Sequence, residues 1–143
     1  MKQVSNIPSH NACFACGQLN QDGLALIFET AGDRICCHTT IDSKYQSYDG
    51  IVHGGILASI ADSTMINLVY RQYGGRPLTC TLDMRYRASI SVGDELTAEA
   101  EILRAKHGIV WTSCRISVGY RLCAEARGAF TIQRREGNKV LES

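Results

Sequence analysis

Hydrophobic and polar residues alternate through most of the second half of the chain, a pattern typical of half-buried β-strands. Turns that contain glycine interrupt the alternation near Gly93, Gly108 and Gly119. The pattern therefore predicts consecutive strands over residues 78–89, 96–106, 109–117 and 120–133. In the first of these, alternation places one set of side chains on one face (Leu78, Cys80, Leu82, Met84, Tyr86) and a second set on the other (Thr79, Thr81, Asp83, Arg85, Arg87).

The first half of the chain predicts a hairpin followed by one long helix. The hairpin joins residues 24–30 to residues 34–41, after an expected loop over residues 12–23. The helix should run from about His53 to Gln72, where a cluster of glycines and a proline ends it. A hairpin, a helix and then several strands indicate an α+β fold. Because this helix is too apolar to lie on a surface, we expect the antiparallel sheet to curl around it.

Length and charge narrow the classes of function. The 143 residues suffice for a single domain, with its core in about residues 12–134 and loose ends over residues 1–11 and 136–143. A net charge of +1 gives no electrostatic reason to expect nucleic acid or a membrane surface as partner. The N-terminus lacks an apolar signal region, and no apolar run is long enough to span a bilayer. We therefore expect a cytoplasmic protein.

Seven cysteines, an odd number in a chain without a secretion signal, argue against a disulfide framework. Cys13-x-x-Cys16 and the adjacent Cys36-Cys37 could together supply four zinc ligands. Neighbouring residues of a strand point to opposite faces, however, and structural zinc sites normally pair two CxxC knuckles. We therefore expect the cysteines to be free thiols, buried or half-buried, with no metal site and no cofactor.

The stretch from Gly50 to Asp62 carries the strongest chemical signal. Gly54 and Gly55 at a helix start leave backbone N–H groups open to a ligand oxygen, and the helix dipole adds partial positive charge. Asp62 follows among apolar neighbours, where a carboxylate is costly unless it is paired, hydrogen-bonded or used. The Gly54 N–H could therefore stabilise an oxyanion, and Asp62 could act as a general base or as a nucleophile.

Alternatives remain open at each of these positions. The two glycines could simply permit close packing of the helix on the sheet, and His53 could be a capping or positioning residue as well as a catalytic one. Gly54 and Asp62 lie eight residues apart on one helix, about 12 Å by helical rise, too far to act on one carbonyl. If both act, the site must be shared between two subunits.

The motif His53-Gly54-Gly55, opening an apolar helix with an acid nine residues after the histidine, resembles the hotdog-fold acyl-CoA thioesterases of the hydroxybenzoyl-CoA and phenylacetate type. The run from Tyr45 to Val52 and the run from Cys13 to Asn20, followed by Gly23-Leu24, are similar to segments of that family. The resemblance covers about residues 12–134. It implies a hotdog fold, hydrolysis of an acyl- or aryl-CoA thioester, and a homodimer or a dimer of dimers.

The same resemblance implies roles for further residues. Gln46 or Ser47 would orient the water or the thioester, and Gly55 would help to bind substrate. A hydroxyl on the strand after the helix would hold the nucleophilic water, for which Thr81 is the best match and Thr79 the next. Cations for the phosphates of CoA would come from a set of basic residues on the predicted strands: Arg85, Arg87, Arg104, Lys106 and Arg121.

Other functions are compatible with the same fold. A hotdog domain could bind acyl-CoA without turnover, but such domains usually lack the helix acid that Asp62 supplies. A hotdog dehydratase needs an Asp–His pair at a different spacing, which the sequence does not contain. A purely structural role is the remaining alternative.

Overall fold

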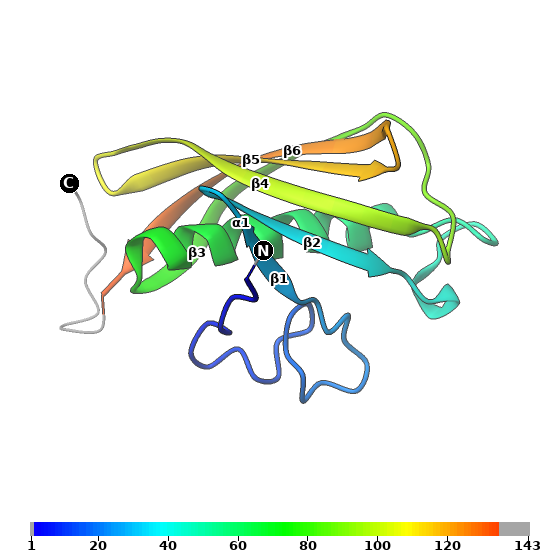
Figure 1. The fold of residues 1–143 in the computed structure, drawn as a ribbon, viewed down its shortest axis with the longest axis horizontal. Helices are drawn as coiled ribbons and strands as arrows, with labels where there is room; N and C mark the ends of the chain where they lie inside the picture. The colour runs from blue at the N-terminus through cyan, green and yellow to red at the C-terminus, as the bar shows by residue number, and fades with distance from the viewer. Residues whose placement is uncertain (1, 135–143) are drawn as a thin grey trace.

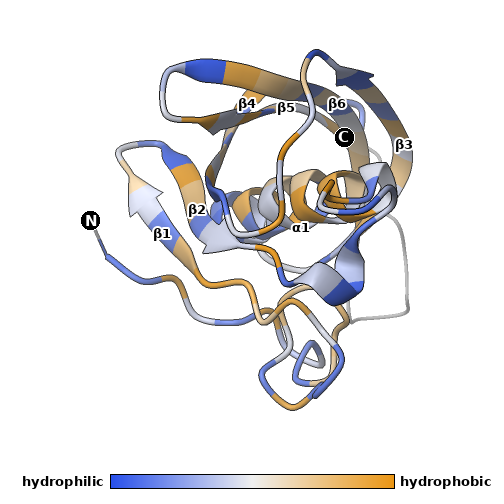
Figure 2. Cartoon of the chain, turned by 90° about the vertical axis from the view of Figure 1, so that its right-hand side faces the viewer, coloured by the Kyte–Doolittle hydropathy of each residue, from blue (hydrophilic) through white to orange (hydrophobic). Residues whose placement is uncertain are grey.

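In the part of the chain that the structure describes, a six-stranded antiparallel sheet wraps around one long helix (Figures 1 and 2). The computed structural model describes residues 2–134. The strand order is β1-β2-β4-β5-β6-β3, and every neighbouring pair is antiparallel. The elements are β1 (Phe28–Ala31), β2 (Arg34–Thr40), a 3-10 turn η1 (Ser43–Tyr45), α1 (Gly54–Tyr73), β3 (Arg76–Tyr86), β4 (Glu95–Lys106), β5 (Ile109–Val118) and β6 (Arg121–Gln133).

The predicted α+β architecture of the hotdog fold is confirmed. In Figure 2 the strands form an arc from β1 to β3, and α1 lies inside the arc. Helix α1 begins and ends within one residue of the prediction, because His53 caps its start and Gly74 ends it with a positive φ of 69°. Its core-facing side chains include Leu57, Ile60 and Met65, which are almost inaccessible to solvent. The curl of the sheet follows from covering so apolar a helix.

Strand β3 forms one edge of the sheet and departs from regular alternation. The pairing with β6 shifts register between Thr79 and Thr81, which leaves Cys80 as the extra residue of a β-bulge. The bulge moves Thr79 onto the face that meets α1, while Thr81 faces a hollow on the outer surface of the sheet. The prediction that Thr79 and Thr81 share one face is therefore wrong. An unbroken period of two cannot represent an inserted residue.

The first hairpin is shorter than predicted. Ala25 has a positive φ of 49°, which interrupts the extended backbone, and Leu24 and Leu26 instead donate backbone hydrogen bonds to the loop at Phe14 and Ala15. Strand β1 consequently starts only at Phe28.

Residues 2–11 are held, contrary to the expectation of a loose end. The Val4 N–H donates to the Phe28 carbonyl at 2.9 Å, the Thr30 N–H donates to the Lys2 carbonyl at 2.8 Å, and Ile7 is buried. The expected loose C-terminal segment, residues 136–143, lies outside the described residues. None of the described helices is both long enough and apolar enough to cross a membrane.

Candidate active site

The start of α1 is built by His53, two glycines and a tyrosine from β3. The His53 Nδ1 atom accepts a hydrogen bond from the Gly55 N–H at 2.8 Å, so the imidazole satisfies one of the open amides of the first turn. The Tyr86 hydroxyl donates to the Gly54 carbonyl at 2.7 Å and ties the helix start to β3. The Gly54 N–H has no hydrogen-bond partner within residues 2–134. It remains available to an oxyanion.

Each glycine of the pair has a different steric role. A Cβ atom at Gly54 would lie 3.4 Å from the nearest atom of the Tyr86 ring, which is ordinary van der Waals contact. A Cβ atom at Gly55 would lie 3.0 Å from the Nδ1 atom of His53, which is tighter than normal packing permits. Close packing therefore does not require glycine at Gly54, whereas a methyl group at Gly55 would push the His53 ring by a few tenths of an ångström.

Gln46 and Ser47 lie in the turn that leads into the helix. The Gln46 Oε1 atom accepts a hydrogen bond from the Gly50 N–H at 2.9 Å, and the Ser47 N–H donates to the Ile51 carbonyl at 2.8 Å. Both residues thus close the turn before His53. A role for either of them in substrate binding stays a prediction.

Asp62 projects from α1 toward β3 and is half-buried. Its Oδ1 atom accepts a hydrogen bond from the Thr79 hydroxyl at 2.8 Å, and no cation pairs with it among residues 2–134. Burial raises the pKa of this carboxyl, and the Thr79 hydrogen bond opposes that rise by stabilising the ionised form. The hydroxyl next to the acid therefore belongs to Thr79, where the sequence favoured Thr81. The sequence contains both residues; only the bulge decides between them.

The carboxylate lies on the least covered side of the helix. Ser59, Asp62 and Ile66 follow one another at helical spacing and are each half-buried, while the residues on the opposite side of α1 are buried. Thr79 on the adjoining strand is exposed. The acid therefore borders a face that a second molecule could cover.

The basic residues that the sequence singled out lie elsewhere. Arg85 and Arg87 line a hollow of about 580 Å³ on the outer surface of the sheet, and Arg87 pairs with Glu125 at 2.8 Å. The Arg104 guanidinium stacks on Trp111, 4.1 Å from the ring centroid. Arg87 and Arg104 each have a partner of their own, and Arg85 lies in the hollow on the face of the sheet away from α1. They are not placed beside Asp62 within one chain.

Sequence reasoning overlooked two residues, one at the helix start and one in the N-terminal loop. Tyr86 was assigned only to a strand face, yet its hydroxyl holds the first carbonyl of α1. His10 was not considered beside the cysteines, yet it lies next to Cys13 and Cys16 in the structure, whereas Cys36 and Cys37 lie on β2. Its spacing of three residues before Cys13 was the available signal.

Comparison with known proteins extends these observations. A Pseudomonas aeruginosa protein named "Putative esterase PA0474" is 28% identical over 92 residues, which are 63% of this chain and 69% of that protein. The crystal structure of RHA08564, a thioesterase superfamily protein, matches with a TM-score of 0.73 at 21% identity. That match covers 80% of this chain but only 60% of the other. A phenylacetic acid degradation-related protein of Ralstonia eutropha JMP134 matches with a TM-score of 0.73 at 16% identity, over 90% of this chain and 92% of that one.

The structural matches, at these identities, establish the fold alone. The sequence evidence goes further, because the family model described as "Thioesterase superfamily" matches residues 49–127, more than half of the chain. The matched span contains the helix start at Gly54, the carboxylate of Asp62 and the strand that bears Thr79. By this match the chain belongs to the thioesterase superfamily.

Proposed function

We propose that this protein hydrolyses an acyl- or aryl-CoA thioester to the free acid and CoA. Membership of the thioesterase superfamily indicates thioester hydrolysis. The observation that carries the finer proposal is the carboxyl of Asp62, half-buried, without a cation among the described residues, and aimed by one hydroxyl. A carboxyl whose pKa is raised toward neutrality is a better proton acceptor at physiological pH than an ordinary one.

The reaction needs one group that acts at the carbon of the thioester carbonyl and one that stabilises negative charge on its oxygen. As a general base, Asp62 would take a proton from water while the water oxygen bonds to the carbonyl carbon. The C–S bond then breaks, and the proton on Asp62 passes to the departing sulfur. As a nucleophile, Asp62 would itself bond to that carbon and expel the thiolate, and water would then hydrolyse the anhydride. In either case the Gly54 N–H would hold the oxyanion, which is worth about 3–4 kcal/mol for a well-placed donor.

The two groups would come from different subunits. Gly54 and Asp62 lie eight residues apart on one straight helix, about 12 Å by helical rise. The β3 edge supports a dimer, because its outer side is unpaired and three of its large apolar side chains are exposed. Leu78 is 40%, Leu82 is 37% and Tyr86 is 52% accessible in the single chain. Pairing across this edge would cover the side of α1 that bears Asp62.

The test is turnover by an Asp62→Asn variant. Asparagine keeps the shape and the Thr79 contact but cannot accept a proton or attack. We expect the release of free thiol from the best of a panel of aliphatic and aromatic acyl-CoAs to fall by about 10²–10⁴-fold. Asp83→Asn is the matched control, since Asp83 is an exposed carboxylate of β3 that lines the outer hollow. Near wild-type turnover by Asp62→Asn would contradict the mechanism.

The same panel separates hydrolysis from binding alone. A non-catalytic acyl-CoA-binding domain would show saturable binding of an acyl-CoA by calorimetry and no thiol release from the wild type. Sedimentation at assay concentration tests the shared site, and an active monomer would contradict it.

A further inference from the structure

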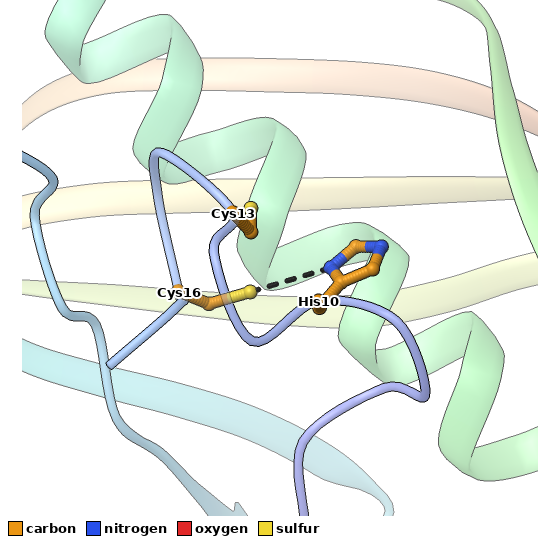
Figure 3. A group of neighbouring side chains, drawn as sticks. All are labelled: His10, Cys13 and Cys16. Atoms are coloured by element: carbon orange, nitrogen blue, oxygen red, sulfur yellow. Dashed lines mark hydrogen bonds between the residues drawn. The ribbon is translucent and has the colours of Figure 1, made fainter. Parts of the chain in front are cut away.

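The loop before β1 brings three potential metal ligands together, outside the group of residues that builds the helix start. His10, Cys13 and Cys16 lie together in front of α1 in Figure 3, and their ligand atoms all lie within 4.8 Å of one another. The Nδ1 atom of His10 lies 3.4 Å from the Sγ atom of Cys16. No other histidine, cysteine or acid of the described residues joins the group. The proposed thioester chemistry uses none of these three side chains.

The distance between His10 and Cys16 matches the geometry of a zinc site. With Zn–S bonds of about 2.3 Å and Zn–N bonds of about 2.0–2.1 Å, tetrahedral angles place sulfur and nitrogen ligands about 3.6 Å apart. The distance of 3.4 Å between Cys16 and His10 is within 0.2 Å of that value. Two thiolates with one imidazole form a soft donor set, which suits Zn²⁺ and does not suit Mg²⁺ or Ca²⁺.

The loop is built tightly enough to hold the three ligands in place. The Gly17 N–H donates to the Cys13 carbonyl at 2.9 Å, and the Cys13 N–H donates to the His10 carbonyl at 3.1 Å. A Cβ atom at Gly17 would lie 2.3 Å from the backbone nitrogen of Cys13, so only glycine fits there. From α1, the buried amide of Asn67 interacts with the Cys16 sulfur. Such a second group beside a ligand is typical of metal sites.

The loop also connects to the candidate active site. The Tyr45 hydroxyl donates to the carbonyls of Asp22 and Gly23 at the end of this loop, the second at 3.0 Å. The backbone carbonyl of Tyr45 accepts a hydrogen bond from the His53 N–H at 3.0 Å. A clamp on the loop would thus stiffen the support of the helix start.

We propose that His10, Cys13 and Cys16 bind one Zn²⁺ ion per chain, with a water molecule as fourth ligand, and that this ion ties the turns of the N-terminal loop to one another. The ion takes no part in the proposed hydrolysis, because its ligands are not among the residues that carry that reaction. This proposal departs from the sequence-based expectation of no metal site. It is independent of the proposed hydrolysis, since it rests on different residues.

Cobalt provides a direct test, because Co²⁺ in a thiolate site gives a charge-transfer band and the strong visible bands of tetrahedral coordination. Reduced, metal-free full-length protein is titrated with Co²⁺ and then with Zn²⁺. We expect both sets of bands to saturate at one equivalent and to disappear as Zn²⁺ replaces Co²⁺. Absence of the charge-transfer band in reduced, folded wild type would overturn the proposal without any variant.

Variants assign the ligands. We expect Cys13→Ser and His10→Asn each to weaken Zn²⁺ binding more than the ~10–100-fold typical of a lost outer partner. Cys80→Ser is the control, because Cys80 is an exposed cysteine outside the cluster, and it should bind like the wild type. Equal loss in Cys80→Ser would overturn the assignment. So would thiol counts showing that Cys13 and Cys16 form a disulfide under air while the reduced protein takes up no cobalt.

Discussion

Replacing Thr79 by valine should change the pH dependence of hydrolysis in a defined direction. Valine has nearly the same shape as threonine but lacks the hydroxyl that donates to the Asp62 Oδ1 atom at 2.8 Å. That hydrogen bond favours the ionised carboxylate and lowers its pKa, in opposition to burial. In the variant only burial remains, so the pKa of Asp62 rises further. The ascending limb of the kcat/KM profile should therefore move to higher pH.

The size of the effect follows from the charge-assisted hydrogen bond. Such bonds contribute about 1.5–3 kcal/mol to the charged form, which corresponds to a roughly 10- to 100-fold smaller ionised fraction below the pKa. On the acid limb, kcat/KM of Thr79→Val should fall by that factor. At high pH, where Asp62 is ionised in both proteins, the two rates should converge.

Three measurements make the test decisive. Thr79→Ser retains a hydroxyl and should keep the wild-type profile. Thr81→Val is the matched control, because Thr81 lies on the same strand but faces the outer hollow. Stopped-assay kcat/KM values across the stable pH range provide the profiles. A Thr79→Val profile that superimposes on the wild type, or a shift caused by Thr81→Val instead, would refute the assignment.

Four further predictions concern stability, catalysis and assembly. Because burial raises the pKa of Asp62 in the folded state, this carboxyl favours folding at pH values below its unfolded pKa. That contribution is lost as the pH rises through its folded pKa. At neutral pH, thermal melts of Asp62→Asn should therefore give a melting temperature no lower than that of the wild type. Gly54→Ala should keep its melting temperature but lose kcat, because the methyl group fits against Tyr86 yet obstructs the amide; lower stability with normal kcat per folded site would remove the oxyanion assignment. Gly55→Ala should melt below Gly54→Ala, because displacing the His53 cap costs about 0.5–2 kcal/mol. Leu82→Lys on the β3 edge should give a folded, inactive monomer by sedimentation, and an active dimer would exclude that edge from the interface.

Local signals in the sequence were sufficient for the helix and most strands. The start of α1 depends on a capping histidine and two glycines, and its end depends on a glycine with positive φ, all of which act within a few residues. The alternation of β4, β5 and β6 depends only on each side chain lying in or out of one core. The helix acid could be found in the same way, because burying a carboxylate within an apolar run costs free energy in any fold.

Features that depend on distant parts of the chain required the tertiary structure. The choice of Thr79 over Thr81 arises from a bulge in the pairing with β6, and no local period encodes an inserted residue. The late start of β1 arises because Leu24 and Leu26 pair with the N-terminal loop. The approach of His10 to Cys13 and Cys16 depends on the turns of that loop over α1. Sequence patterns report which face of an element is buried, whereas register and loop path are decided by the neighbours against which each element packs.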